Sequence, residues 1–315
     1  MDYLLEMKKQ QIQFELIDEK NAVRIMEHEY SYFQLMEYAN LFERYNKTEK
    51  KDLFVNLDFA QLYALAEIDK QLRHLIMTQS LEIENTLKLQ ILAYFNKNNE
   101  LSDLILHRYI MSDKEFLMNT YNDARLDILK GKYKDVSFEN LRVEQFLDVI
   151  QFGTLERLYV FLYENHEECD LNHLEMIKEC LSSIRRLRNA AAHNNSILSN
   201  INIKIDDEHN CFSSKYLYQF LKKRGCGKKT LETNFTKRII RDLCNFGWLL
   251  KLVDSSKKQY KWYNEWYHFW ENISMEYGQL LFGNERLKST FTFMQSVNRL
   301  LLQEMIEIKV DFGKN

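Results

Sequence analysis

Apolar residues recur at helical spacing over most of the chain, which predicts a protein built almost entirely of α-helices. The longest such segment, residues 57–95, contains neither glycine nor proline and repeats leucine or isoleucine every three or four positions. We expect one long helix there, or two nearly collinear ones. Two pairs on it, Asp69 with Arg73 and Glu84 with Lys88, have the spacing of ion pairs on a helix surface.

Helical spacing resumes after a polar loop. One helix is predicted over 101–130, ending at Gly131, and another over 143–164, broken or bent at Gly153. The other expected elements are a helix from an N-cap at Asp170 to about His193, ended by Asn194 and Asn195, an irregular stretch at 200–210, and helices at 230–253 and 259–306.

The composition agrees with this pattern. The 315 residues include no proline and only 8 glycines, the two residues that helix interiors exclude. We therefore predict an all-α fold. The aromatic residues at 260–270 are of the types that stack on nucleic-acid bases, but their helical spacing is more typical of a packed core.

Several classes of protein are not supported. The five cysteines form no Cys-x-x-Cys pair and are odd in number, which argues against a disulfide framework or a zinc site. No signal peptide and no apolar run of about 18 residues are seen, so we expect a cytoplasmic protein without a membrane partner. Metalloprotease, phosphate-loop and GxSxG signatures are absent, and we expect no metal and no cofactor.

Charge is unevenly distributed. The net charge is −3, yet the segment 215–241 holds nine basic residues and one acid, a local charge of +8. Such a concentration attracts polyanions, and we interpret it as an RNA-guiding surface; a solvated, mobile basic loop is the alternative. The candidate RNA contacts are Lys222, Lys223, Arg224, Lys228, Lys229, Lys237 and Arg238.

The stretch "SIRRLRNAAAHNNSI" (183–197) carries the candidate chemistry. At 100° per residue a buried stripe forms from Ile177, Leu181, Ile184, Leu187 and Ala191. Arg186, Asn189 and His193 fall on the opposite, polar side.

Arg188 falls inside the apolar stripe. A guanidinium at the edge of a core needs a carboxylate partner or a crevice, and Glu84 is the candidate partner. The alanines leave Arg188 and His193 uncovered. An arginine that neutralises phosphoryl oxygens and a histidine that transfers protons suit the cleavage of RNA, whose 2′-hydroxyl is its own nucleophile. The alternative is a helix end with a capping histidine.

The motif "RNAAAH" (188–193) resembles the Arg-x4-6-His motif of the HEPN superfamily of ribonucleases. Three further segments resemble its abortive-infection (Abi-like) branch: "YSYFQLMEYANLFE" (30–43), "EIDKQLRHLIMTQSLEIENTLK" (67–88) and "FGTLERLY" (152–159). The resemblance implies a HEPN-like helical bundle, a homodimer and metal-independent RNA cleavage that leaves a 2′,3′-cyclic phosphate. It further implies a role in phage defence or as a toxin, held inactive by a cognate antitoxin that is protein or RNA.

By the same resemblance, Arg188 would stabilise the scissile phosphate, His193 would act as acid and base, and Asn189 would orient one of them. The residues expected to support them are Glu84, Arg73, Arg185 and Arg186. We expect the helical core at 1–200 and a C-terminal helical extension at 201–315. A non-catalytic RNA-binding module and a dimerising scaffold are the alternative functions.

Overall fold

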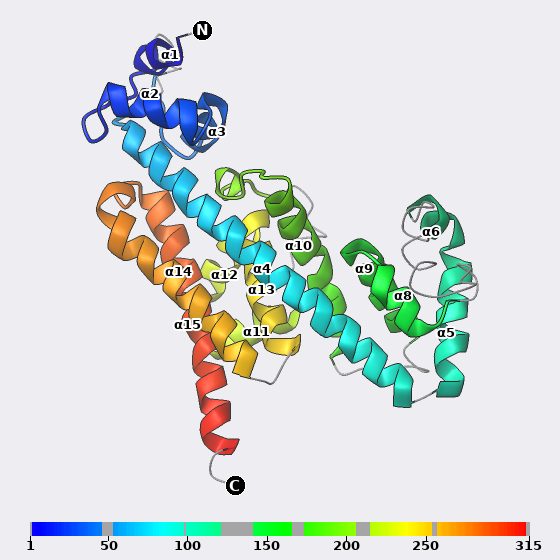
Figure 1. Cartoon of the computed structure of the whole chain (residues 1–315). Coiled ribbons are helices and arrows are strands. Elements are labelled where there is room, and N and C mark those ends of the chain that lie inside the picture. The colour runs from blue at the N-terminus through cyan, green and yellow to red at the C-terminus, as the bar shows by residue number, and fades with distance from the viewer. Residues whose placement is uncertain are drawn as a thin grey trace.

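The computed structural model describes residues 2–45, 53–97, 99–120, 141–165, 173–205, 215–253 and 257–312. Over these residues the chain forms fourteen α-helices and no strand, which confirms the all-α prediction (Figure 1). None of the described helices is both long and apolar enough to cross a membrane.

Three short helices cover the N-terminal end of the longest one (Figure 1). They are α1 (Tyr3–Lys9), α2 (Glu19–His28) and α3 (Tyr32–Ala39). Each begins at a residue whose side chain accepts a hydrogen bond from a backbone N–H of the first turn, namely Asp2, Asp18 and Ser31. These caps fix where each helix starts, because the first N–H groups of a helix have no partner within it.

The central element is α4 (Phe59–Lys97), a single helix of 39 residues, about 58 Å long. It therefore confirms the prediction of one long helix. Its buried side chains do not keep to one face, because different helices cover it along its length. From its N-terminal end onward α4 contacts α3, α14, α10, α9, α8 and α5.

The next helices break at positions that the sequence did not indicate. Over its described residues, which end at Thr120, the predicted helix at 101–130 is two helices, α5 (Asn99–Ser112) and α6 (Lys114–Thr120). The remainder of that prediction, including the end at Gly131, lies outside the described residues. The predicted helix at 143–164 is also two, α8 (Val143–Val149) and α9 (Phe152–Glu164). The break lies at Ile150 rather than at Gly153. Ile150 is extended, and its carbonyl accepts a hydrogen bond from Lys88 Nζ of α4 at 2.8 Å.

Helix α10 (Leu174–Ala192) runs antiparallel to α4. Its Arg188 contacts Glu84 of α4, and the backbone of Ile197, beyond its C-terminal end, contacts Asp69 earlier in α4. The helix starts after His173, which has a positive φ of 59°, so the predicted N-cap is wrong; Asp170 lies outside the described residues. A short 3₁₀ turn, η4 (Leu198–Asn200), follows.

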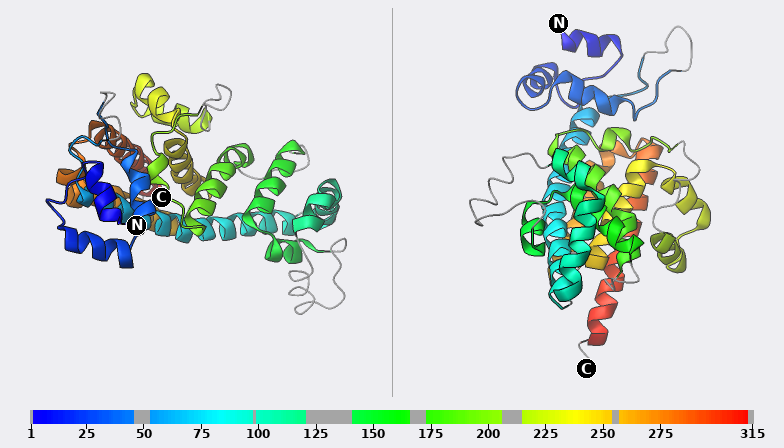
Figure 2. Two further views of the ribbon diagram at one scale, coloured as in Figure 1. Left: turned by 90° about the horizontal axis from the view of Figure 1, so that it is seen from above. Right: turned by 90° about the vertical axis from the view of Figure 1, so that its right-hand side faces the viewer.

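The described residues from 215 onward form five helices. Each of the two predicted helices is again split in two, at Thr236–Lys237 and around Gly283. The helices are α11 (Lys215–Lys223), α12 (Lys228–Phe235), α13 (Arg238–Val253), α14 (Lys257–Leu281) and α15 (Glu285–Phe312). Helix α13 packs on α10, and α14 packs on both α15 and α4. Figure 2 shows α11 and α12 on the outside of the bundle, away from α4.

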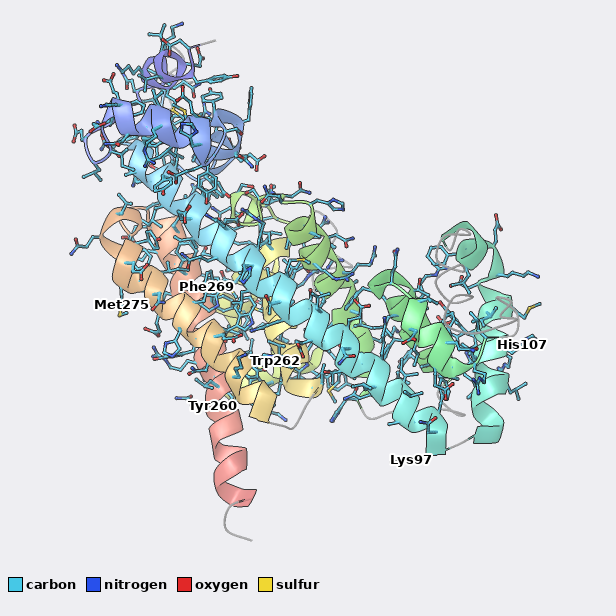
Figure 3. The ribbon with its side chains drawn as sticks, in the orientation of Figure 1. Lys97, His107, Tyr260, Trp262, Phe269 and Met275 are labelled. Carbon is cyan, nitrogen blue, oxygen red and sulfur yellow. The ribbon has the colours of Figure 1, made fainter. Side chains whose placement is uncertain are left out.

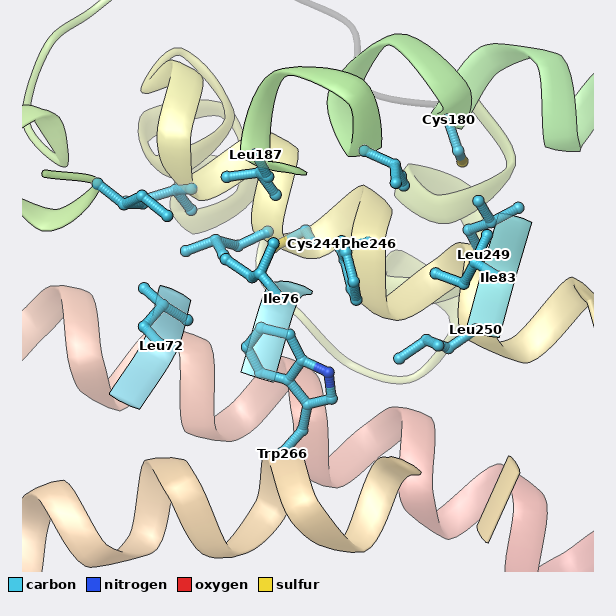
Figure 4. Packing of buried hydrophobic residues seen from close by; sticks show 14 of the residues in the cluster. Leu72, Ile76, Ile83, Cys180, Leu187, Cys244, Phe246, Leu249, Leu250 and Trp266 are labelled. Atoms are coloured by element: carbon cyan, nitrogen blue, oxygen red, sulfur yellow. The ribbon is translucent and has the colours of Figure 1, made fainter. Parts of the chain in front are cut away.

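The aromatic run of α14 belongs to the core, as the spacing predicted. Its buried members are Trp262, Tyr263, Trp266, Phe269 and Trp270, whereas Tyr260 is exposed (Figure 3). The indole N–H of Trp266 donates to Gln79 Oε1 of α4 at 2.6 Å. Trp266 also lies beside Phe246 of α13, with ring centroids 5.6 Å apart (Figure 4). These buried rings are not available to stack on bases.

Candidate functional site

The apolar stripe of α10 is buried as predicted. Ile177, Leu181, Ile184 and Leu187 are each at most 1% exposed, and Ala191 packs against them. This stripe fixes the rotation of the helix, and therefore the direction in which each of its polar side chains points.

Arg188 lies at the edge of this core, with 23% of its side chain exposed. Its Nη2 atom is 3.0 Å from Glu84 Oε2, which confirms the predicted contact. The geometry of this contact is that of an ion pair without a hydrogen bond. Glu84 Oε2 is buried and accepts no hydrogen bond from the described residues. The guanidinium also lies 5.6 Å from the centroid of the Phe152 ring. Among the described residues, no group accepts a hydrogen bond from Arg188, although Glu84 lies at ion-pair distance from its Nη2 atom.

Glu84 has a second cationic neighbour. Lys88 Nζ lies 2.9 Å from Glu84 Oε1. The negative charge of Glu84 is therefore shared between Lys88 and Arg188, which leaves Arg188 less fully neutralised than an arginine with a carboxylate of its own.

His193 is the C-cap residue of α10 and is exposed. Its backbone N–H donates to the Asn189 carbonyl at 3.0 Å. Within the described ranges, no side chain forms a hydrogen bond or ion pair with the imidazole. The side chain of Asn189 is likewise exposed. The imidazole is thus accessible and its two nitrogens are available for proton transfer.

One copy of α10 does not bring Arg188 and His193 together. Five positions along an α-helix separate them by about 7.5 Å along the axis and by about 140° around it. The structure shows no contact between the two side chains. Any site that uses both on one phosphate therefore needs a bent substrate or the same helix of a second subunit.

Arg186 does not lie on an open polar face, as the helical projection had placed it. That side of α10 is covered by α13, whose Asp242 is 1% exposed. Arg186 donates to both carboxylate oxygens of Asp242, from Nε at 2.9 Å and from Nη2 at 2.7 Å. The carboxylate raises the pKa of Arg186 through these hydrogen bonds. Ser183 Oγ also donates to Asp242, at 2.8 Å.

Arg185 pairs with Glu156 of α9, with Nε 2.5 Å from Oε2. Together they line a cleft of about 490 Å³ that also contains Arg157 and Asp113, which are paired with each other. Arg185 and Arg186 thus attach α10 to α9 and α13, and neither points toward His193 as a free cation.

The segment that follows His193 is anchored on α4 by Asp69. This aspartate was predicted on the helix surface, but it is fully buried. Its carboxylate accepts hydrogen bonds from the backbone N–H groups of Ile197 (3.1 Å) and Leu198 (2.8 Å) and from the Tyr38 hydroxyl (3.0 Å), and it pairs with Arg73. The sequence held a signal that was missed, because Asp69 lies between Leu65, Ile68 and Leu72 in the apolar stripe of α4.

Two of these partners, Tyr38 and Arg73, line a polar pocket of about 600 Å³, which we call the Arg73 pocket. The Arg73 side chain is 11% exposed. Gln34, Glu37 and Asn40 contribute from α3 and its C-terminal end, and Asn194 and Asn195 from the segment directly after His193. The pocket was not foreseen from the sequence because its walls come from three segments far apart in the chain.

The basic segment is two helices and a short turn rather than a loop. Gly225 makes the turn possible with a φ of +93°, which other residues rarely adopt. The exposed members of the predicted RNA-binding set are Lys222, Lys223, Arg224, Lys228, Lys229 and Arg238. Lys237 differs from them: burial lowers its pKa, and its Nζ donates to Thr290 at 3.3 Å. The structure therefore does not present Lys237 as an exposed phosphate contact.

These features define an all-helical protein with an arginine and a histidine at the exposed end of one packed helix. The family model described as Abi-like protein matches residues 26–199, which is 174 of the 315 residues and includes Arg188, His193 and Asp69. The chain therefore belongs to the Abi-like family, which suggests a role in abortive infection, a form of phage defence. Comparison with curated proteins found no match, nor did comparison with solved structures.

No group of three or more potential metal ligands occurs among the described histidine, cysteine, aspartate and glutamate residues.

Proposed function

We propose that this protein is a metal-independent endoribonuclease of the HEPN type, which acts as an abortive-infection effector or toxin. The observation that supports it most is the state of Arg188. It is a permanent cation at a partly open position that makes no hydrogen bond to the described residues, and it lies on the same helix end as an accessible histidine. Both residues lie within the Abi-like match.

In the proposed reaction, Arg188 binds the non-bridging oxygens of a phosphodiester and stabilises the charge that develops on them. The imidazole of His193 takes the proton of the neighbouring 2′-hydroxyl. The 2′-oxygen then bonds to phosphorus, the bond from phosphorus to the 5′-oxygen breaks, and that oxygen leaves with a proton. The products are a 2′,3′-cyclic phosphate and a 5′-hydroxyl end. Asn189 is proposed to orient Arg188 or His193.

We propose a homodimer as the active form because one helix end separates the two side chains. A two-fold pairing of the α10 ends supplies a second arginine and a second histidine. His193 of one subunit then acts as the base, and His193 of the partner subunit donates the proton to the leaving oxygen. Activity per subunit is expected to fall on dilution below the dissociation constant of the dimer, as measured by sedimentation velocity.

Cleavage of labelled RNA in the presence of EDTA tests the proposal. Arg188→Ala and His193→Ala are each expected to lower the rate at least a hundredfold, the usual effect of losing a charge-stabilising or proton-transferring group. The matched controls are Arg24→Ala and His28→Ala, which remove exposed residues of the same types from α2. Equal cleavage by the α10 variants and their controls would refute the proposal.

The Arg188→Ala variant is expected to fold, because Glu84 keeps Lys88 as a partner at 2.9 Å. A loss of about 1 kcal/mol in the free energy of unfolding is expected from one ion pair at a partly exposed site. Circular dichroism melts of each variant separate a loss of chemistry from a loss of fold.

The exposed basic turn between α11 and α12 favours a second function, RNA binding without cleavage. Such a protein would bind RNA in a strongly salt-dependent manner and leave it intact after long incubation. The same EDTA assay distinguishes the two functions. Control of the protein by a cognate antitoxin is proposed in either case.

A further inference from the structure

The Arg73 pocket includes the residues that directly follow the proposed cleavage histidine in the chain. Asn194 and Asn195, which line the pocket, directly follow His193. Asn194 adopts a positive φ of 55°, and the N–H of Asn195 donates to the Ala190 carbonyl at 2.9 Å. This compact end to α10 places the histidine and the pocket side by side.

The pocket is held in shape by buried contacts. Asp69 pairs with Arg73 and accepts hydrogen bonds from the backbone N–H groups of Ile197 and Leu198 and, at 3.0 Å, from the Tyr38 hydroxyl. These buried contacts fix Arg73 and the backbone at 197–198, whereas the side chains of Glu37, Asn40, Asn194 and Asn195 are exposed. The pocket volume of about 600 Å³ lies within the usual range of ligand sites.

The groups that line the pocket are unusually rich in free hydrogen-bonding capacity. Among the described residues, the side chains of Glu37, Asn40, Asn194 and Asn195 have no hydrogen-bond or ion-pair partner. Three of these are carboxamides, which pair with the edges of nucleobases, and one is a carboxylate, which accepts from adjacent N–H donors. Arg73 adds one cation, which is 11% exposed and paired with Asp69, so a phosphate shares this cation with the buried carboxylate.

We propose that the Arg73 pocket binds one ribonucleotide of the RNA substrate, next to the bond that is cut, and that Glu37 selects guanine. Guanine presents two adjacent donors, N1–H and N2–H, to a carboxylate, and no other common base does so. The carboxamides of Asn40 and Asn195 bind the remaining base edge, and Arg73 faces the phosphate. This inference rests on the proposed ribonuclease function for its substrate, but the binding itself does not require cleavage.

Binding is tested by calorimetry with the full-length His193→Ala protein and the four 5′-ribonucleoside monophosphates. GMP is expected to bind most tightly. Glu37→Gln is expected to weaken GMP about tenfold, as for the loss of a charge-assisted hydrogen bond, and to remove the preference over AMP. Asn195→Ala is expected to weaken all four nucleotides. The matched control is Glu115→Gln, which alters an exposed carboxylate at a different pocket.

Cleavage by the wild-type protein gives the second readout. Sequencing of the product ends is expected to show guanine enriched at one fixed position beside the cut, and Glu37→Gln is expected to abolish that enrichment, whereas Glu115→Gln keeps it. Cleavage with no base preference, together with nucleotide binding that is insensitive to Glu37 and Asn195, would overturn the pocket assignment and leave the ribonuclease intact. Tight GMP binding without any cleavage would support the pocket and refute the ribonuclease.

Discussion

Asp69 offers the sharpest test of how the site is held together. It is fully buried in α4, and its carboxylate binds the Tyr38 hydroxyl, two backbone N–H groups beyond the end of α10, and Arg73. The substitution Asp69→Asn keeps the shape of the side chain but removes its charge. One amide oxygen then remains to accept from the backbone, and an NH₂ group faces Arg73.

The expected cost follows from these contacts. A hydrogen bond to a charged group contributes roughly 1.5–3 kcal/mol, and a cation left without its buried partner costs roughly 3–5 kcal/mol. Arg73 is 11% exposed, so water reaches part of the guanidinium and reduces the second figure. We expect Asp69→Asn to lower the free energy of unfolding by about 3 kcal/mol, out of the 5–15 kcal/mol typical of a folded protein.

Urea unfolding followed by circular dichroism measures this loss. The matched control is Asp58→Asn, which removes the charge of another largely buried aspartate of the same region, bound to the backbone of Glu15 and Ala60. Both variants are expected to be destabilised, but only Asp69→Asn is expected to change nucleotide binding at the Arg73 pocket per folded molecule. An effect of Asp69→Asn below 1 kcal/mol, or equal effects of both on nucleotide binding, would contradict this account.

Three further results are expected. Burial lowers the pKa of Lys251 from its ordinary 10.5 to about 8. Below pH 8 the half-buried positive charge therefore destabilises the folded state, and this destabilisation is lost as the pH rises from 8 to 10.5. Relative to Lys251→Met, the wild type should gain about 1–2 kcal/mol between pH 7 and 10 in urea unfolding, a value reduced for partial exposure; a constant difference would exclude it. Arg186→Ala leaves the buried Asp242 with a single serine donor and should lower the free energy of unfolding by about 2–3 kcal/mol. Most of this loss should be absent when Asp242→Asn is added, as measured in a double-mutant cycle. Replacing Lys222 and Lys223 by alanine should reduce the salt dependence of RNA binding by about 1.4 in log–log slope in anisotropy titrations, and an unchanged slope would remove them from the interface.

The helices were predictable because they depend on local spacing. The stripe of α10 and the single long helix α4 both appear as the periodicity predicted. The contact between Arg188 and Glu84 was predictable for a related reason. A charged residue inside an apolar stripe requires a partner, and the sequence offers few carboxylates that interrupt another stripe.

The breaks between helices were not predictable from spacing alone. The helix breaks at Ile150, whose carbonyl accepts a hydrogen bond from Lys88, some sixty positions earlier in the chain. Arg186 leaves the polar face because Asp242 of α13 covers it. The Arg73 pocket depends in the same way on α3, α4 and the end of α10. In each case the partner that determines the structure is distant in the sequence, so the local pattern does not predict it.

The three neighbouring arginines of α10 illustrate how packing separates residues of one type into different roles. Arg185 pairs with Glu156 of α9, and Arg186 donates two hydrogen bonds to Asp242 of α13. Arg188 instead shares Glu84 with Lys88 and makes no hydrogen bond to any described group. A phosphate that binds Arg185 or Arg186 must displace a carboxylate that is hydrogen-bonded to the guanidinium, whereas the carboxylate beside Arg188 forms an ion pair with it but no hydrogen bond. In the proposed reaction, the choice of Arg188 as the phosphate-binding arginine therefore depends on which carboxylates surround the helix, not on the arginine side chain itself.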